Sequence, residues 1–235
     1  MKKETINKLE NENNERLDHY LDALQALKYI MSQSEDYYGH WIENIQRDII
    51  EWQTNQDSKI HLGNYGGMGS FNDLGGGSYF TNIQSIAYRL ATNPNDIESV
   101  EKSMGTLGLQ LDGYHCPNCG YNEVYKSKIE TYVRNHFVRA EVLEHFRTAS
   151  LLELMKKRRD LDWSSLDNQV KNATQLALNS NIAVVKDHPW IETCPKCGKK
   201  GIDIYHWVLN NKEDQFVPYS LDANALSDNI RSAFK

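Results

Sequence analysis

Two copies of one short pattern decide how this sequence is read: CPNCG at residues 116–120 and CPKCG at residues 194–198. In each copy two residues separate the cysteines, so both thiols of one tight turn can reach the same ion, and the proline stiffens the turn. The glycine after the second cysteine permits a positive φ that frees backbone N–H groups for the sulfur atoms. The pattern predicts one tetrahedral metal site built from all four cysteines of the chain: Cys116, Cys119, Cys194 and Cys197.

The donor set favours one structural zinc ion. Four thiolates close the coordination sphere, whereas catalytic zinc keeps an open position and usually takes a histidine or carboxylate ligand. Iron is the alternative, since rubredoxin-type sites use the same turns. A redox CxxC needs only one pair, and a disulfide framework is disfavoured because no apolar signal segment follows Met1. We expect His115 and His206, which lie near the two turns, to pack or to support the ligands.

Each cysteine turn precedes a strand-like run, at residues 121–125 and 202–209. A turn of this kind followed by a strand resembles a zinc ribbon, and the resemblance covers residues 113–126 and 191–209. It implies a small β module around the metal. It implies no particular activity, because zinc ribbons occur in nucleic-acid proteins, in enzymes and in scaffolds.

The predicted fold is mainly α with a small β zinc ribbon, in the α+β class. Ordinary ribbons separate their knuckles by a short stretch, but residues 120–193 are long enough to hold two helices. We predict a helical domain over residues 1–110 with a glycine-rich loop at 61–78. We predict a zinc-ribbon-like domain over residues 111–235, with a helical insert at 127–180 and a C-terminal helix.

Apolar residues at helical spacing predict the helices. Ser34 is the expected N-cap of the second helix, whose apolar face ends at Trp52. The helix from 128 to 157 is the longest, and Val133, Phe137 and Phe146 mark its expected core face. The other helices are predicted over residues 5–32, 79–91, 95–107, 163–178 and 219–234.

Seven glycines fall within residues 61–78, and such a backbone takes tight or left-handed turns. Exposed amides of a glycine-rich loop can cradle phosphate at a helix N-terminus, although this loop lacks the Walker lysine and a clean dinucleotide fingerprint. The alternative is a structural loop in which glycines allow close packing. The candidate ligand residues are Gly66, Gly67, Gly69, Ser70, Asn72 and Asp73.

The sequence GGMGSFND at residues 66–73 lies between two predicted helices. Residues 41–93 thereby resemble a small uncharacterised bacterial domain family that carries a GGMGSxND motif. An intervening polar segment commonly follows the motif in such proteins, and GGGS at residues 75–78 stands in its place here. The resemblance implies a bacterial origin and brings no established activity.

A basic run closes the longest predicted helix: Lys156, Lys157, Arg158 and Arg159. Cations in a last turn complement the helix dipole, which is the structural interpretation. The functional interpretation is a nucleic-acid patch whose contacts with phosphates weaken with salt. The net charge of −6 does not favour extensive nucleic-acid binding, but it allows a local patch.

The remaining patterns limit the function. No long uncharged apolar run predicts a membrane span, and none of the common catalytic motifs is present, so we assign no catalytic residue. We expect a cytoplasmic, zinc-stabilised bacterial binding or adaptor protein that acts through a protein or nucleic-acid partner, for example in a toxin-immunity or defence complex. The alternatives are an enzyme acting on a phosphate-containing or nucleic-acid substrate at the glycine-rich loop, and a zinc-stapled subunit of a larger assembly. The sequence leaves the oligomeric state open.

Overall fold

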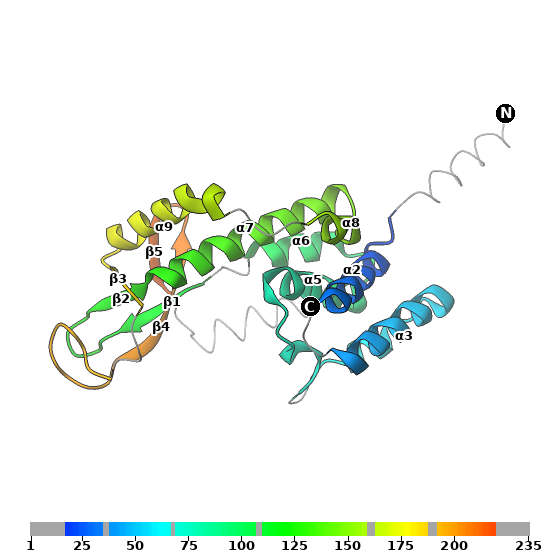
Figure 1. The fold of residues 1–235 in the computed structure, drawn as a ribbon, viewed down its shortest axis with the longest axis horizontal. Coiled ribbons are helices and arrows are strands. Elements are labelled where there is room, and N and C mark those ends of the chain that lie inside the picture. The colour runs from blue at the N-terminus through cyan, green and yellow to red at the C-terminus, as the bar shows by residue number, and fades with distance from the viewer. Residues whose placement is uncertain are drawn as a thin grey trace. The chain divides into compact units, whose positions relative to one another are not determined.

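The computed structural model describes residues 17–34, 38–66, 69–106, 110–158, 163–187 and 192–219. The fold is mainly helical with one five-stranded mixed sheet, as expected for the predicted α+β class (Figure 1). The chain forms two compact units. Unit 1 comprises Met1–Leu107 and Phe137–Asp160, and unit 2 comprises Gly108–His136 and Leu161–Lys235.

Unit 1 is helical. Its elements are α2 (His19–Gln33), α3 (Gly39–Asn55), α4 (Lys59–Gly63), the 3-10 turn η1 (Phe71–Asp73), α5 (Gly77–Thr92), α6 (Ile97–Thr106), the second half of α7 (Lys126–Thr148) and α8 (Leu151–Lys157). Helix α2 packs against α3, α5 and α8, and Leu24 and Leu27 on α2 are fully buried with Phe80 of α5. The amphipathic stripe predicted for the second half of the first helix is therefore a core face.

Helix α2 begins after Asp18, whose carboxylate accepts a hydrogen bond of 3.0 Å from the N–H of Leu21. The expectation that Ser34 caps the next helix is wrong. Ser34 ends α2 instead, because its N–H bonds to the carbonyl of Met31, and α3 starts at Gly39. The predicted helical residues 5–16 and the predicted C-terminal helix over 220–234 lie outside the described residues.

The helix predicted over residues 128–157 is two helices, α7 and α8, that meet at Ser150. The Ser150 hydroxyl accepts from the N–H of Glu153, and the buried carboxylate of Asp22 on α2 accepts from the N–H of Leu151 at 2.6 Å. These two acceptors satisfy the first amides of α8, so a new helix can begin there. Phe137 was expected on the core face of α7, but it is 37% exposed and its neighbour Val138 is buried.

Unit 2 is built on the sheet, with strand order β3-β2-β1-β4-β5. Its elements are β1 (Gln110–His115), β2 (Asn122–Tyr125), the first half of α7, η2 (Trp163–Leu166), α9 (Asp167–Asn179), β3 (Ala183–Val185), β4 (Asp203–Asn210) and β5 (Gln215–Pro218). All neighbours are antiparallel except β2 and β3, which are parallel. One buried cluster joins Val124 and Trp207 of the sheet to Ile129 of α7 and Ala173 of α9.

The central strand β1 was not predicted, because the predicted domain boundary fell between residues 110 and 111 and because Asp112 and Gly113 are poor strand residues. Tertiary packing explains the glycine. A Cβ on Gly113 would lie 2.6 Å from the Trp207 ring and 2.3 Å from the carbonyl oxygen of Glu123. Only glycine allows β1 to pass this close to its neighbours. Within the described residues, no helix has both the length and the apolar character needed to cross a bilayer.

Candidate functional site

The structure brings the four cysteines together, as their spacing predicts. Cys116 and Cys119 lie in the turn between β1 and β2, and Cys194 and Cys197 lie in the turn that precedes β4. All four sulfur atoms lie within 4.8 Å of one another. The Cys116–Cys197 sulfurs are 3.8 Å apart and the Cys119–Cys194 sulfurs are 3.7 Å apart, so neither pair forms a disulfide. Four thiols in this arrangement could hold a metal ion.

The two cysteine turns have the same backbone geometry. Gly120 donates its N–H to the carbonyl of Cys116 at 2.8 Å, and Gly198 donates to that of Cys194 at 2.9 Å. The φ angles of these glycines are 68° and 70°, which confirms the positive φ predicted from the sequence. A repeated turn therefore presents each pair of thiols in the same way.

The thiols differ in their affinity for protons. Burial raises the pKa of the Cys116 thiol. The N–H donors of Cys119 and Asn118 and the neighbouring thiols lower it by more, so the pKa falls to about 6. Burial and hydrogen bonds with the other thiols raise the pKa of Cys119 to about 12, against a lowering effect of the Tyr121 N–H. The crowded sulfurs therefore do not all ionise by themselves, and a bound cation would supply the missing positive charge.

The cysteine site is buried on one side and exposed on the other. Cys116 and Cys194 are buried with Ile202, whereas Cys197 is exposed. Both nearby histidines form hydrogen bonds with side chains other than the cysteines. His115 pairs with the side chain of Asn122, and His206 pairs with the carboxylate of Asp112, each at 2.7 Å. Their geometry agrees with the expected packing or supporting role.

The glycine-rich loop uses its polar residues internally. The Asp73 carboxylate accepts from the N–H groups of Gly69 at 2.7 Å and Ser70 at 3.1 Å, and Ser70 and Asp73 form a capping box around η1. The Ser70 hydroxyl also bonds to the side chain of Asn72. Gly67 lies outside the described residues. The amides that the sequence offered as a phosphate cradle thus bind the loop's own carboxylate.

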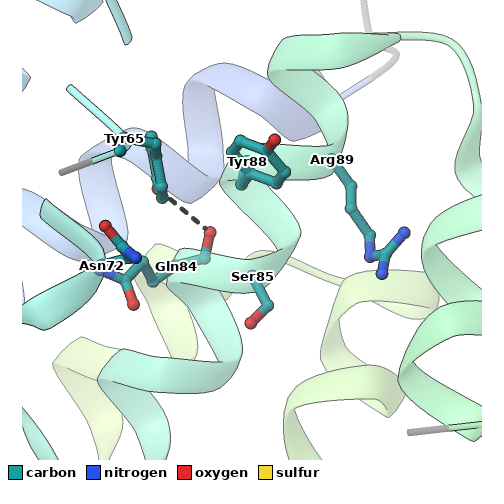
Figure 2. Close-up of a pocket in the computed structure, with 7 residues that line it drawn as sticks. Tyr65, Asn72, Gln84, Ser85, Tyr88 and Arg89 are labelled. Atoms are coloured by element: carbon teal, nitrogen blue, oxygen red, sulfur yellow. Dashed lines mark hydrogen bonds between the residues drawn. The ribbon is translucent and has the colours of Figure 1, made fainter. Parts of the chain in front are cut away.

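A pocket of about 440 Å³ does open beside this loop, within unit 1 (Figure 2). Figure 2 shows α5 on one side of it and Tyr65 and Asn72 on the other. The sequence pointed to only Gly66 and Asn72 among the seven lining residues, which are Tyr65, Gly66, Asn72, Gln84, Ser85, Tyr88 and Arg89. The α5 residues gave no signal of their own, because they form an ordinary polar helix face until the loop folds over them.

A buried chain of polar side chains lies behind Tyr65. His61 and Asp48 are both buried, and His61 Nδ1 lies 2.9 Å from Asp48 Oδ2. The other ring nitrogen of His61 lies 3.2 Å from the Tyr65 hydroxyl. With Nδ1 protonated toward the carboxylate, Nε2 accepts from Tyr65. No sequence pattern points to this set of hydrogen-bonded side chains, because its members come from α3, α4 and the loop after α4.

Burial also acts on the ionisable groups of the pocket. Desolvation, followed by the charges of Tyr20 and Asp48, raises the pKa of Tyr65 far above its ordinary value. Desolvation lowers the pKa of Arg89, which is half-buried. Tyr65 is therefore a neutral hydroxyl, and Arg89 is a guanidinium that has lost part of its hydration.

The predicted basic residues that the structure describes have partners within the chain. Lys156 and Lys157 lie 3.3 and 3.4 Å from the carboxylate of Glu153, whose pKa their hydrogen bonds and charges lower. The Arg158 guanidinium stacks 4.5 Å above the ring of Tyr79. Arg159 lies outside the described residues. Three of the four predicted cations thus have intramolecular partners.

A family described as a domain of unknown function (DUF6966) matches residues 34–77. The matched segment contains the glycine-rich motif and the residues Asp48, His61 and Tyr65, but it contains none of the cysteines. Neither the curated proteins nor the solved structures give a match to this chain. The one matched family thus overlaps the pocket of unit 1 and stops before the cysteine site of unit 2.

Proposed function

We propose that the four thiols bind one structural zinc ion in a zinc-ribbon-like module and that the chain is a binding protein which acts through a partner protein. A zinc–thiolate bond is about 2.3 Å long, so the sulfurs of a regular tetrahedral site lie about 3.8 Å apart. The two measured separations of 3.8 and 3.7 Å agree with that value. This agreement is the observation that carries the zinc part of the proposal.

The coordination chemistry supports binding over catalysis at this centre. Four thiolates fill the four positions of zinc and leave no place for a water or a substrate. The ion would hold the β1–β2 turn to the turn before β4, which are 75 or more residues apart in the sequence. Zinc thus acts as a clamp that keeps the sheet of unit 2 intact.

The sheet offers a surface for a partner protein. Its inner face carries Leu111 and Trp207 beneath α7 and α9, and the opposite face carries their strand neighbours. On that opposite face Ile204 is 58% exposed, and Asp112 is already paired with His206. An apolar side chain offers no charge or hydrogen bond to a polyanion, so this face suits a protein partner better. A toxin-immunity or defence complex is the setting we propose for such a partner.

Affinity capture from the native cell tests this proposal when three proteins are used in parallel: the wild type, Ile204→Glu and Leu178→Glu. Leu178 is the matched control, because it is an exposed apolar residue of the same unit on α9. We expect a partner protein that the wild type and Leu178→Glu retain and that Ile204→Glu loses. Equal recovery of every captured protein with Ile204→Glu would contradict the proposed surface.

A second candidate function is action on a phosphate-containing substrate at the glycine-rich loop. The observation in its favour is the pocket beside Gly66 and Asn72. Replacing Asp73 does not test it cleanly, because the carboxylate of Asp73 caps the loop. Arg89 offers a cleaner test, since it lines the pocket without holding the loop together.

A further inference from the structure

We infer that the pocket of unit 1 binds a small phosphomonoester with a planar ring, of the size of a nucleoside monophosphate, and that Arg89 binds its phosphate. This inference deepens the second candidate function, on which it rests, and it requires neither zinc nor a partner protein. Its failure would leave the zinc-stabilised binding function standing.

The charge of the pocket is the first argument. Arg89 is the only charged side chain among the seven described lining residues, and no carboxylate lies within ion-pair distance of it in the described chain. Partial burial has already removed some of its water and lowers its pKa. A half-desolvated guanidinium without a counter-charge is unfavourable by itself, and an oxyanion would relieve that cost through two parallel hydrogen bonds.

Two further polar side chains, Ser85 and Asn72, line the pocket with Arg89. Ser85 lies one turn earlier on α5 and donates its hydroxyl hydrogen to the carbonyl of Thr81, and Asn72 is exposed at the pocket wall. Figure 2 shows Ser85 and Arg89 extending from the same helix and Asn72 on a separate segment, on the side of Ser85 away from Arg89. The loop amides of Gly69 and Ser70 are taken by Asp73, so the charged side chain of Arg89 is the group assigned to the anion.

The aromatic wall accounts for the planar ring. Tyr65 and Tyr88 both line the pocket, and their ring centroids are 4.6 Å apart. Both rings are half-buried, so each still offers surface to a ligand. The His61–Asp48 pair fixes the Tyr65 hydroxyl from behind, which makes this wall rigid. A volume of about 440 Å³ falls in the ordinary range for small-molecule sites.

Isothermal titration calorimetry tests the inference with five probes: AMP, UMP, adenosine, uridine and inorganic phosphate. We expect saturable binding of at least one nucleotide, and binding of the matching phosphate-free compound at least about tenfold weaker, because the ion pair with Arg89 is lost. Arg89→Gln should weaken nucleotide binding by about tenfold or more, and Arg89→Lys by less, since lysine keeps the charge but not the planar fork. Arg47→Gln is the matched control, because Arg47 is exposed on α3 of the same unit.

Three outcomes would overturn the inference. The first is no saturable binding of either nucleotide up to about 5 mM, a concentration that detects even millimolar affinity. The second is equal affinity of wild type and Arg89→Gln, and the third is equal weakening by Arg47→Gln, which would indicate nonspecific attraction. Circular dichroism of each variant confirms that the fold is intact, so a loss of binding reports the site.

Discussion

The cysteine site of unit 2 and the pocket of unit 1 stabilise buried ionisable groups in different ways. Each holds ionisable groups out of water, where a charge needs a partner. In unit 2 the partner would be a cation held by two copies of one local turn. In unit 1 the partners are other side chains, such as Asp48 with His61, drawn from separate segments. The stability of unit 2 should therefore depend on a bound ion, and that of unit 1 on its own internal hydrogen bonds.

Loss of one thiol should have the largest effect and should be confined to unit 2. Cys194→Ser leaves three sulfur ligands, so we expect zinc to be lost and the free energy of unfolding of unit 2 to fall by about 5 kcal/mol or more. Zinc content and thermal melting with and without a chelator measure this. Lys196→Ser, an exposed change in the same turn, is the control and should melt like the wild type. A Cys194→Ser protein that keeps its zinc and its melting temperature would rule out the shared four-thiolate site.

Breaking the buried pair of unit 1 should come next in size. His61→Leu leaves the Asp48 carboxylate buried without its main partner, which costs about 3–5 kcal/mol of stability. The double variant Asp48→Leu/His61→Leu should cost less than the two single changes added together, because neither polar group is then left buried without its partner. Urea denaturation measures both, and His40→Leu, at an exposed position, is the control. Simple additivity in this cycle would show that the pair has no coupling.

The cap between α2 and α8 should have an intermediate effect. Asp22→Ala removes the acceptor for the N–H groups of Leu151 and Leu152 and should cost about 2–3 kcal/mol. The loss should be the same with and without chelator, which distinguishes unit 1 from unit 2. Glu43→Ala, a removal of an exposed carboxylate on α3, should change stability little. A chelator-dependent loss in Asp22→Ala would contradict the independence of the two units.

The smallest effect is expected at the basic run. Lys156→Gln/Lys157→Gln removes two exposed ion pairs with Glu153 and should change stability by less than about 0.5 kcal/mol. Because these cations already have partners, we also expect the variant and the wild type to behave alike in mobility-shift assays with DNA and RNA at low salt. A wild-type shift that weakens steeply with salt and is lost in the variant would make nucleic acid the partner instead.

Sequence patterns predicted local features well and cross-chain features poorly. The positive φ of Gly120 and Gly198 follows from a turn of a few residues, and the core stripe of α2 follows from helical periodicity. The long helix was predicted without its break at Ser150, although the Ser150–Glu153 spacing is a local capping pattern that could have indicated it. The second acceptor at this break, Asp22, lies 129 residues before Leu151, and no local pattern contains that contribution.

By itself, the sequence determined that four thiols would meet in two matched turns and that helices would dominate the rest of the chain. Only the tertiary structure decided that β1 is the central strand, that Asp48 and His61 support Tyr65, and that Arg89 faces a pocket. The physical reason is the range of the interactions. A turn or a helix face is set by residues a few positions apart, whereas a sheet centre, a buried pair or a pocket exists only once distant segments have packed.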